Sequence, residues 1–188
     1  MGISKLAVVG ATGNVGREML NILSERNFPC EEVIALASER SEGDAVPFGN
    51  KELIVQSLSS YDFSETSIAL FSAGGKISEV YGPIAAEQGC IVIDNSSKFR
   101  MDNDVPLIVP EVNIEMLEHY RTTNIIANPN CSTIQMVVAL KPLEDLASIN
   151  RINVSSYQST SGAGKVAMEE LFNQTKGIFS NQEVQPES

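Results

Sequence analysis

Cysteine, histidine and tryptophan are scarce in this chain of 188 residues, which has three cysteines, one histidine and no tryptophan. The cysteines, Cys30, Cys90 and Cys131, are odd in number and follow no regular spacing. Such a set does not build a disulfide framework, and with one histidine it does not build a zinc cluster. We therefore expect a protein of a reducing compartment without disulfides or a metal site. Cys30 and Cys90 stand beside apolar residues and are expected in the core.

Long apolar runs and positive charge are also lacking. No segment approaches the roughly 20 apolar residues that a membrane-spanning helix needs. The amino terminus shows no basic segment followed by an apolar stretch and a cleavage site. Lysine and arginine number 13 against 24 aspartates and glutamates, and the formal net charge of -11 repels the phosphates of nucleic acids. We expect a cytoplasmic protein that binds neither membrane nor nucleic acid.

A glycine turn near the amino terminus joins a predicted strand at residues 6–9 to a predicted helix at residues 15–26. Its spacing is G-x-x-G-x-x-G, from Gly10 to Gly16. Glycines let the backbone turn tightly and approach a pyrophosphate, which then lies at the helix N-terminus. Similar turns occur in α/β proteins that bind no nucleotide, but the position after the first strand favours a dinucleotide site. The predicted cofactor-binding residues of this turn are Gly10, Thr12, Gly13, Asn14 and Val15.

The end of the second predicted strand, at residues 32–37, indicates which nicotinamide cofactor the chain binds. NAD sites carry an acidic residue here for the ribose hydroxyls, and Glu39 is available. Arg40, flanked by the hydroxyls of Ser38 and Ser41, instead offers a cation and donors to a 2′-phosphate. We predict NADP in preference to NAD. The alternative is that Arg40 is one more solvated charge in a surface loop.

Apolar runs at residues 53–56, 68–71 and 90–93 predict further strands, and residues 77–88 have helical spacing. The run at 68–71 ends in small residues, beginning with Ser72, which would let a ligand lie across the strand end. Strands that alternate with helices predict an α/β fold with a Rossmann-like doubly wound parallel sheet.

Arg100 follows the last of these strands after a short polar segment. Ligands bind at the carboxyl ends of strands in open α/β sheets, so its guanidinium is placed to hold an anion bidentately. A surface ion pair with Asp102 or Asp104 explains the spacing equally well. The only histidine, His119, lies on a predicted short helix and is expected to be a surface side chain rather than a catalyst.

Cys131 lies between a predicted strand at residues 124–127 and a predicted helix that runs from residue 132 to about residue 145. Pro129 prevents the strand from continuing. Free N–H groups and the helix dipole favour an anion at a helix N-terminus, so a thiol there ionises more readily than one in a core. This position predicts a nucleophile. The alternative is a small buried hydrophobe.

After this helix, residues 149–159 are expected to form a long strand that carries Gln158. A second glycine turn contains Ser161 and Gly162 and leads to a helix predicted from residue 165 to about residue 176. The turn brings backbone close to the nicotinamide end of a cofactor, or it is a plain helix-entry loop.

The string at residues 128–135, NPNCSTIQ, resembles the active-site motif of aspartate-semialdehyde dehydrogenases. The glycine turn, Arg40, Arg100 and residues 158–164 occur in the order and with the spacing of that family. The resemblance covers essentially the whole chain. It implies NADP-dependent, reversible reductive dephosphorylation of L-aspartyl 4-phosphate to L-aspartate 4-semialdehyde and phosphate, a step toward diaminopimelate, lysine, methionine and threonine.

The resemblance also implies roles for single residues. Cys131 would form a thioester with the acyl group, Arg100 and Asn130 would bind the phosphate, and Gln158 would position the tetrahedral adduct. It implies two domains, an NADP-binding domain of residues 1–127 and the start of an α+β catalytic and dimerisation domain at residues 128–188. The complete enzyme would be a homodimer or tetramer.

One group that the family uses is not matched. Its acid/base histidine and its substrate-binding glutamate, lysine and arginine come from a later segment, and His119 does not match that histidine. We therefore expect an amino-terminal portion of the enzyme with an incomplete second domain, exposed apolar surface and weak or no activity of its own. Three alternatives remain open: an N-acetylglutamyl-phosphate reductase, a phosphorylating dehydrogenase of the glyceraldehyde-phosphate type, and a non-catalytic NADP-binding domain.

Overall fold

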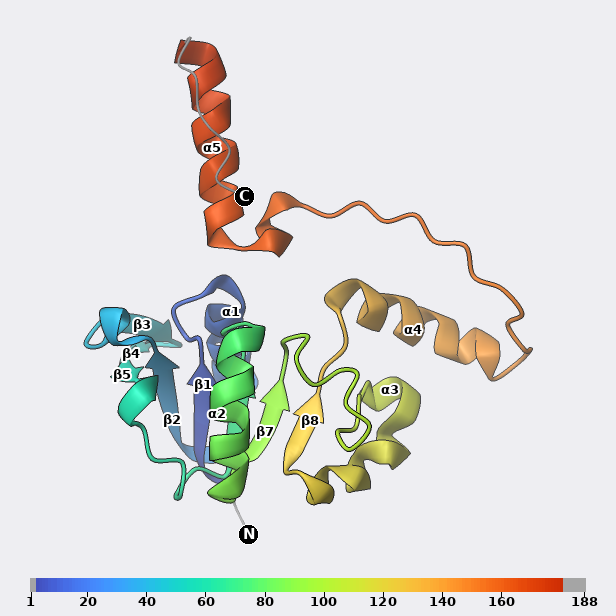
Figure 1. Cartoon of the computed structure of the whole chain (residues 1–188), viewed down its shortest axis with the longest axis horizontal. Coiled ribbons are helices and arrows are strands. Elements are labelled where there is room, and N and C mark those ends of the chain that lie inside the picture. The colour runs from blue at the N-terminus through green and yellow to red at the C-terminus, as the bar shows by residue number, and fades with distance from the viewer. Residues whose placement is uncertain (1–2, 181–188) are drawn as a thin grey trace. The chain divides into compact units, whose positions relative to one another are not determined.

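A six-stranded sheet organises the chain, whose computed structural model describes residues 3–180 (Figure 1). Every pair of neighbouring strands is parallel, in the spatial order β5-β2-β1-β6-β7-β8. The chain starts in the middle of the sheet and adds strands first on one side and then on the other, which is the doubly wound order of dinucleotide-binding folds. The predicted Rossmann-like sheet is confirmed. Its strands are β1 (Ile3–Val9), β2 (Cys30–Ala37), β5 (Gln56–Ser57), β6 (Ile68–Phe71), β7 (Ile91–Asp94) and β8 (Ile125–Ala127).

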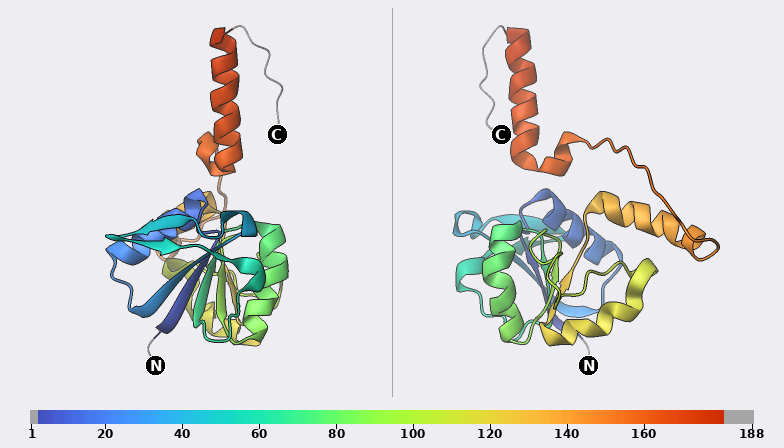
Figure 2. Two further views of the ribbon diagram at one scale, coloured as in Figure 1. Left: turned by 90° about the vertical axis from the view of Figure 1, so that its left-hand side faces the viewer. Right: turned by 45° about the vertical axis from the view of Figure 1, so that its right-hand side comes forward.

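Helices cover both faces of this sheet (Figure 2). The first helix, α1 (Asn14–Glu25), lies on one face, and α2 (Gly75–Glu87) lies on the other. A further helix, α4 (Cys131–Glu144), follows β8. None of the helices within residues 3–180 is long and apolar enough to cross a membrane. The smaller elements are the hairpin of β3 (Ala45–Phe48) and β4 (Lys51–Ile54), the helix α3 (Pro110–Asn113), and 3-10 helices at Glu39–Ser41, Leu58–Ser60 and Ile114–Thr122.

Alternate residues of β1 belong to two apolar clusters, one on each face of the sheet. Leu6 and Val8 share a cluster with Leu20 of α1. Val9 belongs to the cluster that contains Ala85 of α2. Successive side chains of a strand point to opposite faces, and here both faces are covered, which explains the uninterrupted apolar run of the sequence.

The weak strand predicted at residues 53–56 is wrong in its extent. Ile54 ends β4, and Gln56 begins β5. Between them, the backbone of Val55 bonds to the backbone of Gly43 and Asp44, so the chain turns from the hairpin to the edge of the main sheet.

The long strand predicted at residues 149–159 is also wrong. This segment pairs with no strand of residues 3–180, and its side chains are exposed from residue 150 onward, Tyr157 to 99 %. A strand requires a partner for its N–H and C=O groups, and a partly alternating pattern does not supply one.

The chain divides into two compact units, Met1–Arg151 and Ile152–Ser188. The described part of the second unit consists of residues 152–159 without regular secondary structure, a 3-10 helix (Thr160–Ala163) and α5 (Lys165–Ser180). Gly177 is the only buried residue of the two helices. The predicted domain boundary at residues 127 and 128 stays a prediction. Large apolar side chains of the second unit are exposed: Ile152, Val154, Tyr157, Val166, Met168, Leu171, Phe172, Ile178 and Phe179.

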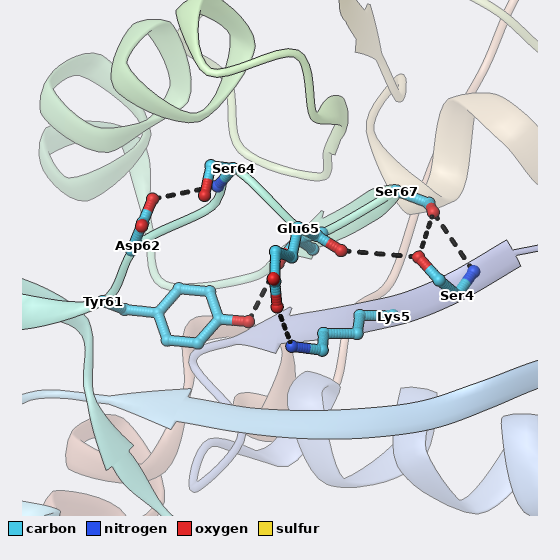
Figure 3. Close-up of polar contacts among 8 residues, drawn as sticks. Ser4, Lys5, Tyr61, Asp62, Ser64, Glu65 and Ser67 are labelled. Atoms are coloured by element: carbon cyan, nitrogen blue, oxygen red, sulfur yellow. Dashed lines mark hydrogen bonds and ion pairs between the residues drawn. The ribbon is translucent and has the colours of Figure 1, made fainter.

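Polar contacts hold the amino-terminal edge of the sheet together (Figure 3). The Lys5 ammonium lies 2.6 Å from the Glu65 carboxylate, and this hydrogen bond raises the pKa of Lys5. Ser4 Oγ lies 3.1 Å from Ser67 Oγ and also donates to the backbone oxygen of Glu65. These contacts join the start of β1 to the loop before β6. The candidate site lies at the opposite edge, where the carboxyl ends of the strands lie.

Candidate active site

A cleft lies at the carboxyl ends of β1, β2 and β6, where the strand order reverses. Its volume is about 580 Å³, which is within the range of small-molecule sites. The reversal point of a doubly wound sheet is the usual position of a dinucleotide. Six of the residues predicted to bind the cofactor line this cleft together: Gly10, Thr12, Gly13, Ser38, Arg40 and Ser72.

Two glycines of the first turn are required by close packing. Gly10 has a φ of 86°, and a Cβ built on it would lie 2.9 Å from the backbone carbon of Ser72. A Cβ on Gly16 would lie 2.1 Å from the carbonyl oxygen of Gly10. The turn is therefore held against both β6 and α1. Because Gly10 and Gly13 line the cleft with backbone alone, a ligand can approach the main chain closely.

The N-terminus of α1 suits an anion. Gly13 is its N-cap and provides no side-chain hydrogen bond to the first turn of the helix, and N–H groups in such a turn suit an anionic ligand. The pyrophosphate of a nicotinamide dinucleotide is such an anion, and the residues present fit this group. Asn14 and Val15 begin α1 with exposed side chains and are not among the cleft-lining residues.

The loop after β2 brings charges of both signs to the cleft. Arg40 lines it, and the guanidinium makes no hydrogen bond or ion pair with any residue of the described chain. Glu39 also lines it, but the carboxylate accepts a hydrogen bond of 2.7 Å from Ser59 Oγ. Ser41 is not a lining residue. The positive charge is thus available to an anionic group, while the carboxylate already has a donor.

Sequence reasoning missed the apolar wall of the cleft. Ile77 and Tyr81 of α2 line it, and their spacing of four places them on one face of the helix. That spacing, directly after the small residues that end β6, was sufficient to identify them. Leu58 and Ser59 come from a short 3-10 helix whose polar composition predicts only a connection. Ala37 and Ala73 complete the lining.

Arg100 connects the ends of two neighbouring strands. Its Nε donates to the backbone oxygen of Asn128 at 2.8 Å, and its Nη2 donates to the backbone oxygen of Asn95 at 3.1 Å. Asn95 follows β7 and Asn128 follows β8. The alternative of a surface ion pair with an aspartate is wrong, because the half-buried guanidinium bonds to carbonyl groups instead.

Cys131 is the first residue of α4 and is exposed. Asn130 is the N-cap of this helix, and its Oδ1 accepts hydrogen bonds from Ser132 N at 3.0 Å and from Ser132 Oγ at 2.6 Å. Cys131 Sγ lies 4.0 Å from the same oxygen. The predicted position at a strand-to-helix join is confirmed, and the alternative of a buried hydrophobe is wrong.

The cleft and Cys131 share one edge of the sheet. The strands β1, β6, β7 and β8 are consecutive parallel neighbours. The carboxyl ends of β1 and β8 are therefore three strand spacings apart, about 14 Å. Arg100 bridges the last two of these ends. The cleft, a guanidinium and a thiol thus follow one another along a single edge.

The other thiols and the histidine lie in different surroundings. Cys90 is fully buried, and burial raises the pKa of its thiol to about 12. Cys30 is half-buried, and its pKa is also raised by burial. The core position predicted for Cys90 is confirmed. His119 is exposed in the 3-10 helix after α3. No group of three histidine, cysteine or acidic side chains within residues 3–180 could hold a metal ion.

Three predicted site residues belong to the second unit: Gln158, Ser161 and Gly162. Gln158 lies against the backbone of Gly162, since a Cβ built on that glycine would lie 2.1 Å from Gln158 Nε2. Ser161 N donates to Ser159 Oγ at 3.3 Å. Each of the three is exposed. Their roles toward a cofactor or a substrate stay predictions.

Two protein-family models match the chain. The model of the semialdehyde dehydrogenase NAD binding domain matches residues 5–120, which is more than half of the chain. The chain belongs to the semialdehyde dehydrogenase family. The model of the semialdehyde dehydrogenase dimerisation domain matches residues 140–188. The cleft therefore lies in a domain of the kind that binds a nicotinamide cofactor.

Named relatives agree with this family. The chain is 58 % identical to aspartate-semialdehyde dehydrogenase 2 of Vibrio cholerae over 175 residues, which are 93 % of this chain and 52 % of that protein. It is 55 % identical to the aspartate-semialdehyde dehydrogenase of Aquifex aeolicus over 181 residues, 96 % of this chain and 53 % of that one. The predicted resemblance is confirmed. The chain spans about half the length of these relatives.

Solved structures are similar as well. Aspartate semialdehyde dehydrogenase II of Vibrio cholerae, complexed with ASA, has a TM-score of 0.92 and 53 % identity, and the match covers 98 % of this chain and 55 % of that one. Aspartate semialdehyde dehydrogenase of Candida albicans with NADP has a TM-score of 0.68 and 26 % identity over 78 % of this chain and 48 % of that one.

Proposed function

We propose that this protein is an NADP-dependent aspartate-semialdehyde dehydrogenase, which converts L-aspartyl 4-phosphate to L-aspartate 4-semialdehyde. The observation that carries the proposal is the exposed Cys131 at the N-terminus of α4, on the same sheet edge as the nucleotide cleft. The names of the similar proteins support the substrate, and the Vibrio cholerae structure is described as a complex with ASA.

The proposed reaction begins at Cys131. The thiolate attacks the carbonyl carbon of the acyl phosphate, a C–S bond forms, and the C–O bond to phosphate breaks as phosphate leaves with the electron pair. Arg100 and Asn130 hold the phosphate oxygens, Arg100 through N–H groups other than those bonded to the two backbone oxygens. Gln158 donates a hydrogen bond to the tetrahedral adduct. The cleft residues would hold NADPH, which when bound would supply the hydride that reduces the thioester. The C–S bond then breaks, the electron pair returns to the Cys131 sulfur, and the aldehyde leaves.

The proposed cofactor site extends the cleft. Arg40 binds the 2′-phosphate between the hydroxyls of Ser38 and Ser41, and the first turn of α1 binds the pyrophosphate. The unpaired guanidinium of Arg40 supports NADP rather than NAD. The full set of proposed cofactor-binding residues is Gly10, Thr12, Gly13, Asn14, Val15, Ser38, Arg40, Ser41, Ser72, Ser161 and Gly162.

The proposal also includes an oligomeric state and a cellular compartment. The dimerisation-domain match at residues 140–188 and the exposed apolar side chains of the second unit support a homo-oligomer. Three free cysteines support a reducing compartment, and we propose the cytoplasm. The reaction belongs to the synthesis of lysine, methionine and threonine.

Acyl transfer to the protein tests the proposed function. Incubation with L-aspartyl 4-phosphate, without reduced cofactor, should give a thioester whose mass corresponds to one aspartyl group on the peptide that contains Cys131. The Cys131→Ala variant should remain unmodified. N-acetylglutamyl phosphate should label the chain much more slowly, and faster labelling by it would identify the related reductase instead. Nucleotide binding without any thioester would support a non-catalytic NADP-binding domain.

Replacement of Arg40 tests the cofactor. In Arg40→Ala, the Kd for NADPH should rise roughly 10- to 100-fold, which is the usual loss for charge-assisted hydrogen bonds to a phosphate. The Kd for NADH should change little, because NADH has no 2′-phosphate. Both constants can be measured by the fluorescence of the reduced cofactor, which no tryptophan obscures. The matched control is Arg26→Ala, which removes the same charge at the far end of α1. Equal losses for the two cofactors would contradict the 2′-phosphate role.

A further inference from the structure

The last residue of β7, Asp94, is a fully buried carboxylate. None of the ion pairs among residues 3–180 involves it. A charged group in a protein interior is costly unless hydrogen bonds replace its water. Three donors do so here: Ser78 Oγ at 2.6 Å and Ser96 N at 3.2 Å bond to Oδ1, and Ser96 Oγ at 2.6 Å bonds to Oδ2.

These bonds determine the shape of the turn that follows β7. Ser78 belongs to α2, so its bond ties the carboxylate to the helix on the neighbouring face. Both bonds from Ser96 fold the turn back onto Asp94. Ser96 Oγ also accepts a hydrogen bond of 3.1 Å from the backbone N–H of Lys98. The carboxylate therefore holds the turn directly at Ser96, and Ser96 in turn holds it at Lys98.

The turn after β7 also positions Arg100. The backbone oxygen of Asn95, next to Asp94, accepts the bond from Arg100 Nη2 at 3.1 Å. The backbone oxygen of Asp94 itself accepts from the N–H of Asn128 at 2.8 Å, and Asn128 accepts from Arg100 Nε at 2.8 Å. The carboxylate of Asp94 thus shapes the turn that holds the Asn95 carbonyl, and the backbone of Asp94 holds Asn128.

Asn128, which accepts the hydrogen bond from Arg100 Nε, is also close in sequence to Cys131. Cys131 is the third residue after Asn128, and this length of chain spans at most about 11 Å. The positive charge of Arg100 therefore lies close enough to act on an anion that approaches the thiol, provided that the salt concentration is low.

We propose that Asp94 is a positioning residue of this site: its buried carboxylate fixes the turn after β7 and thereby directs the guanidinium of Arg100 toward an anion beside Cys131. The inference rests on the proposed function, in which that anion is the phosphate of an acyl phosphate. Asp94 itself contacts neither substrate nor cofactor and acts through Arg100.

Two alkylating reagents measure the charge beside the thiol. Iodoacetate is an anion and iodoacetamide is neutral. The rate of iodoacetate divided by the rate of iodoacetamide at Cys131 is therefore higher when a cation lies nearby. The rates are read from the Cys131 peptide by mass spectrometry at low ionic strength. Arg100→Gln calibrates the assay and should lower the ratio about threefold, as expected for one unit charge at roughly 7 Å in water.

Ser96→Ala and Asp94→Asn test the positioning. Ser96→Ala changes no charge, yet it should lower the ratio about twofold, because the turn loses two hydrogen bonds that shape it. Asp94→Asn should also lower the ratio, although loss of a negative charge by itself would raise it. The matched control is Ser97→Ala, because the exposed Ser97 side chain has no hydrogen bond within the described residues, and its ratio should equal that of the wild type.

The outcomes separate this inference from the function on which it rests. A higher ratio in Asp94→Asn, or a wild-type ratio in a folded Ser96→Ala, would overturn the positioning role. A lower melting temperature with an unchanged ratio would mean that Asp94 is purely structural, which also overturns it. An unchanged ratio in Arg100→Gln would contradict the anion-binding role of Arg100 and thus the proposed function itself. If Asp94→Asn does not fold, Ser96→Ala decides alone.

Discussion

Iodoacetamide should alkylate Cys131 about 10³-fold faster than Cys90 in the folded chain at about pH 8. Burial raises the pKa of the Cys90 thiol from 9.0 to about 12, which lowers its thiolate population by three powers of ten. The Cys90 side chain is also fully buried, whereas Cys131 is exposed at a helix N-terminus. Cys30, half-buried with a raised pKa, should react at an intermediate rate. Peptide mass spectrometry resolves the three thiols in one sample.

The control is the same reaction in concentrated guanidinium chloride. Unfolding removes both burial and the helix, so the three thiols should then react at similar rates. As the pH is raised, the alkylation rate of Cys90 should keep rising about tenfold per pH unit until the pH approaches the raised pKa of its thiol. Similar rates for Cys131 and Cys90 in the folded chain would show that the loop before α4 does not expose a reactive thiol, and the proposed nucleophile would be lost.

Replacing Gly16 by alanine should destabilise the first unit by about 3 kcal/mol or more. The added methyl group would lie 2.1 Å from the carbonyl oxygen of Gly10, which is backbone and cannot rotate away as a side chain can. Either α1 must move away from the sheet or the turn must open. Urea unfolding followed by far-ultraviolet circular dichroism measures the loss.

Gly13→Ala is the matched control, three residues earlier in the same turn. A Cβ there would lie 3.3 Å from the nearest atom, again the carbonyl oxygen of Gly10, and the φ of -77° suits alanine. We expect a loss of only about 1 kcal/mol, which is the usual preference for glycine over alanine at an N-cap. Gly13 lines the cleft, so nucleotide binding should still weaken. Equal unfolding midpoints for the two variants would contradict the packing argument.

Most of the sheet was predictable because β1, β6, β7 and β8 each contain an uninterrupted apolar run that is followed by a turn. Leu6 to Val9 are buried on both faces, and this produces the continuous pattern that a parallel strand requires. Cys131 was predictable for a local reason: Pro129 and the helical spacing after it place the thiol at a helix start whatever surrounds it. Such features depend on neighbours in the sequence.

The errors concern contacts between distant residues. The pattern of residues 149–159 suits a strand, but no strand of the described chain lies beside it. Arg100 has aspartates nearby in the sequence, yet it bonds to carbonyl groups that β7 and β8 bring together. Ser59 reaches Glu39 only because β5 pairs with β2. No local sequence pattern predicts these contacts.

Both apolar clusters consist of residues that precede Asn128, and the hydrogen bonds that shape the Cys131 loop end at Gln135. During synthesis on a ribosome, chains fold from the amino terminus as complete units leave the exit tunnel. Everything needed to shape the loop before α4 has therefore been translated before Gln158 appears. The loop that carries the Cys131 thiol therefore has all its hydrogen-bonding partners before the later part of the chain is synthesised.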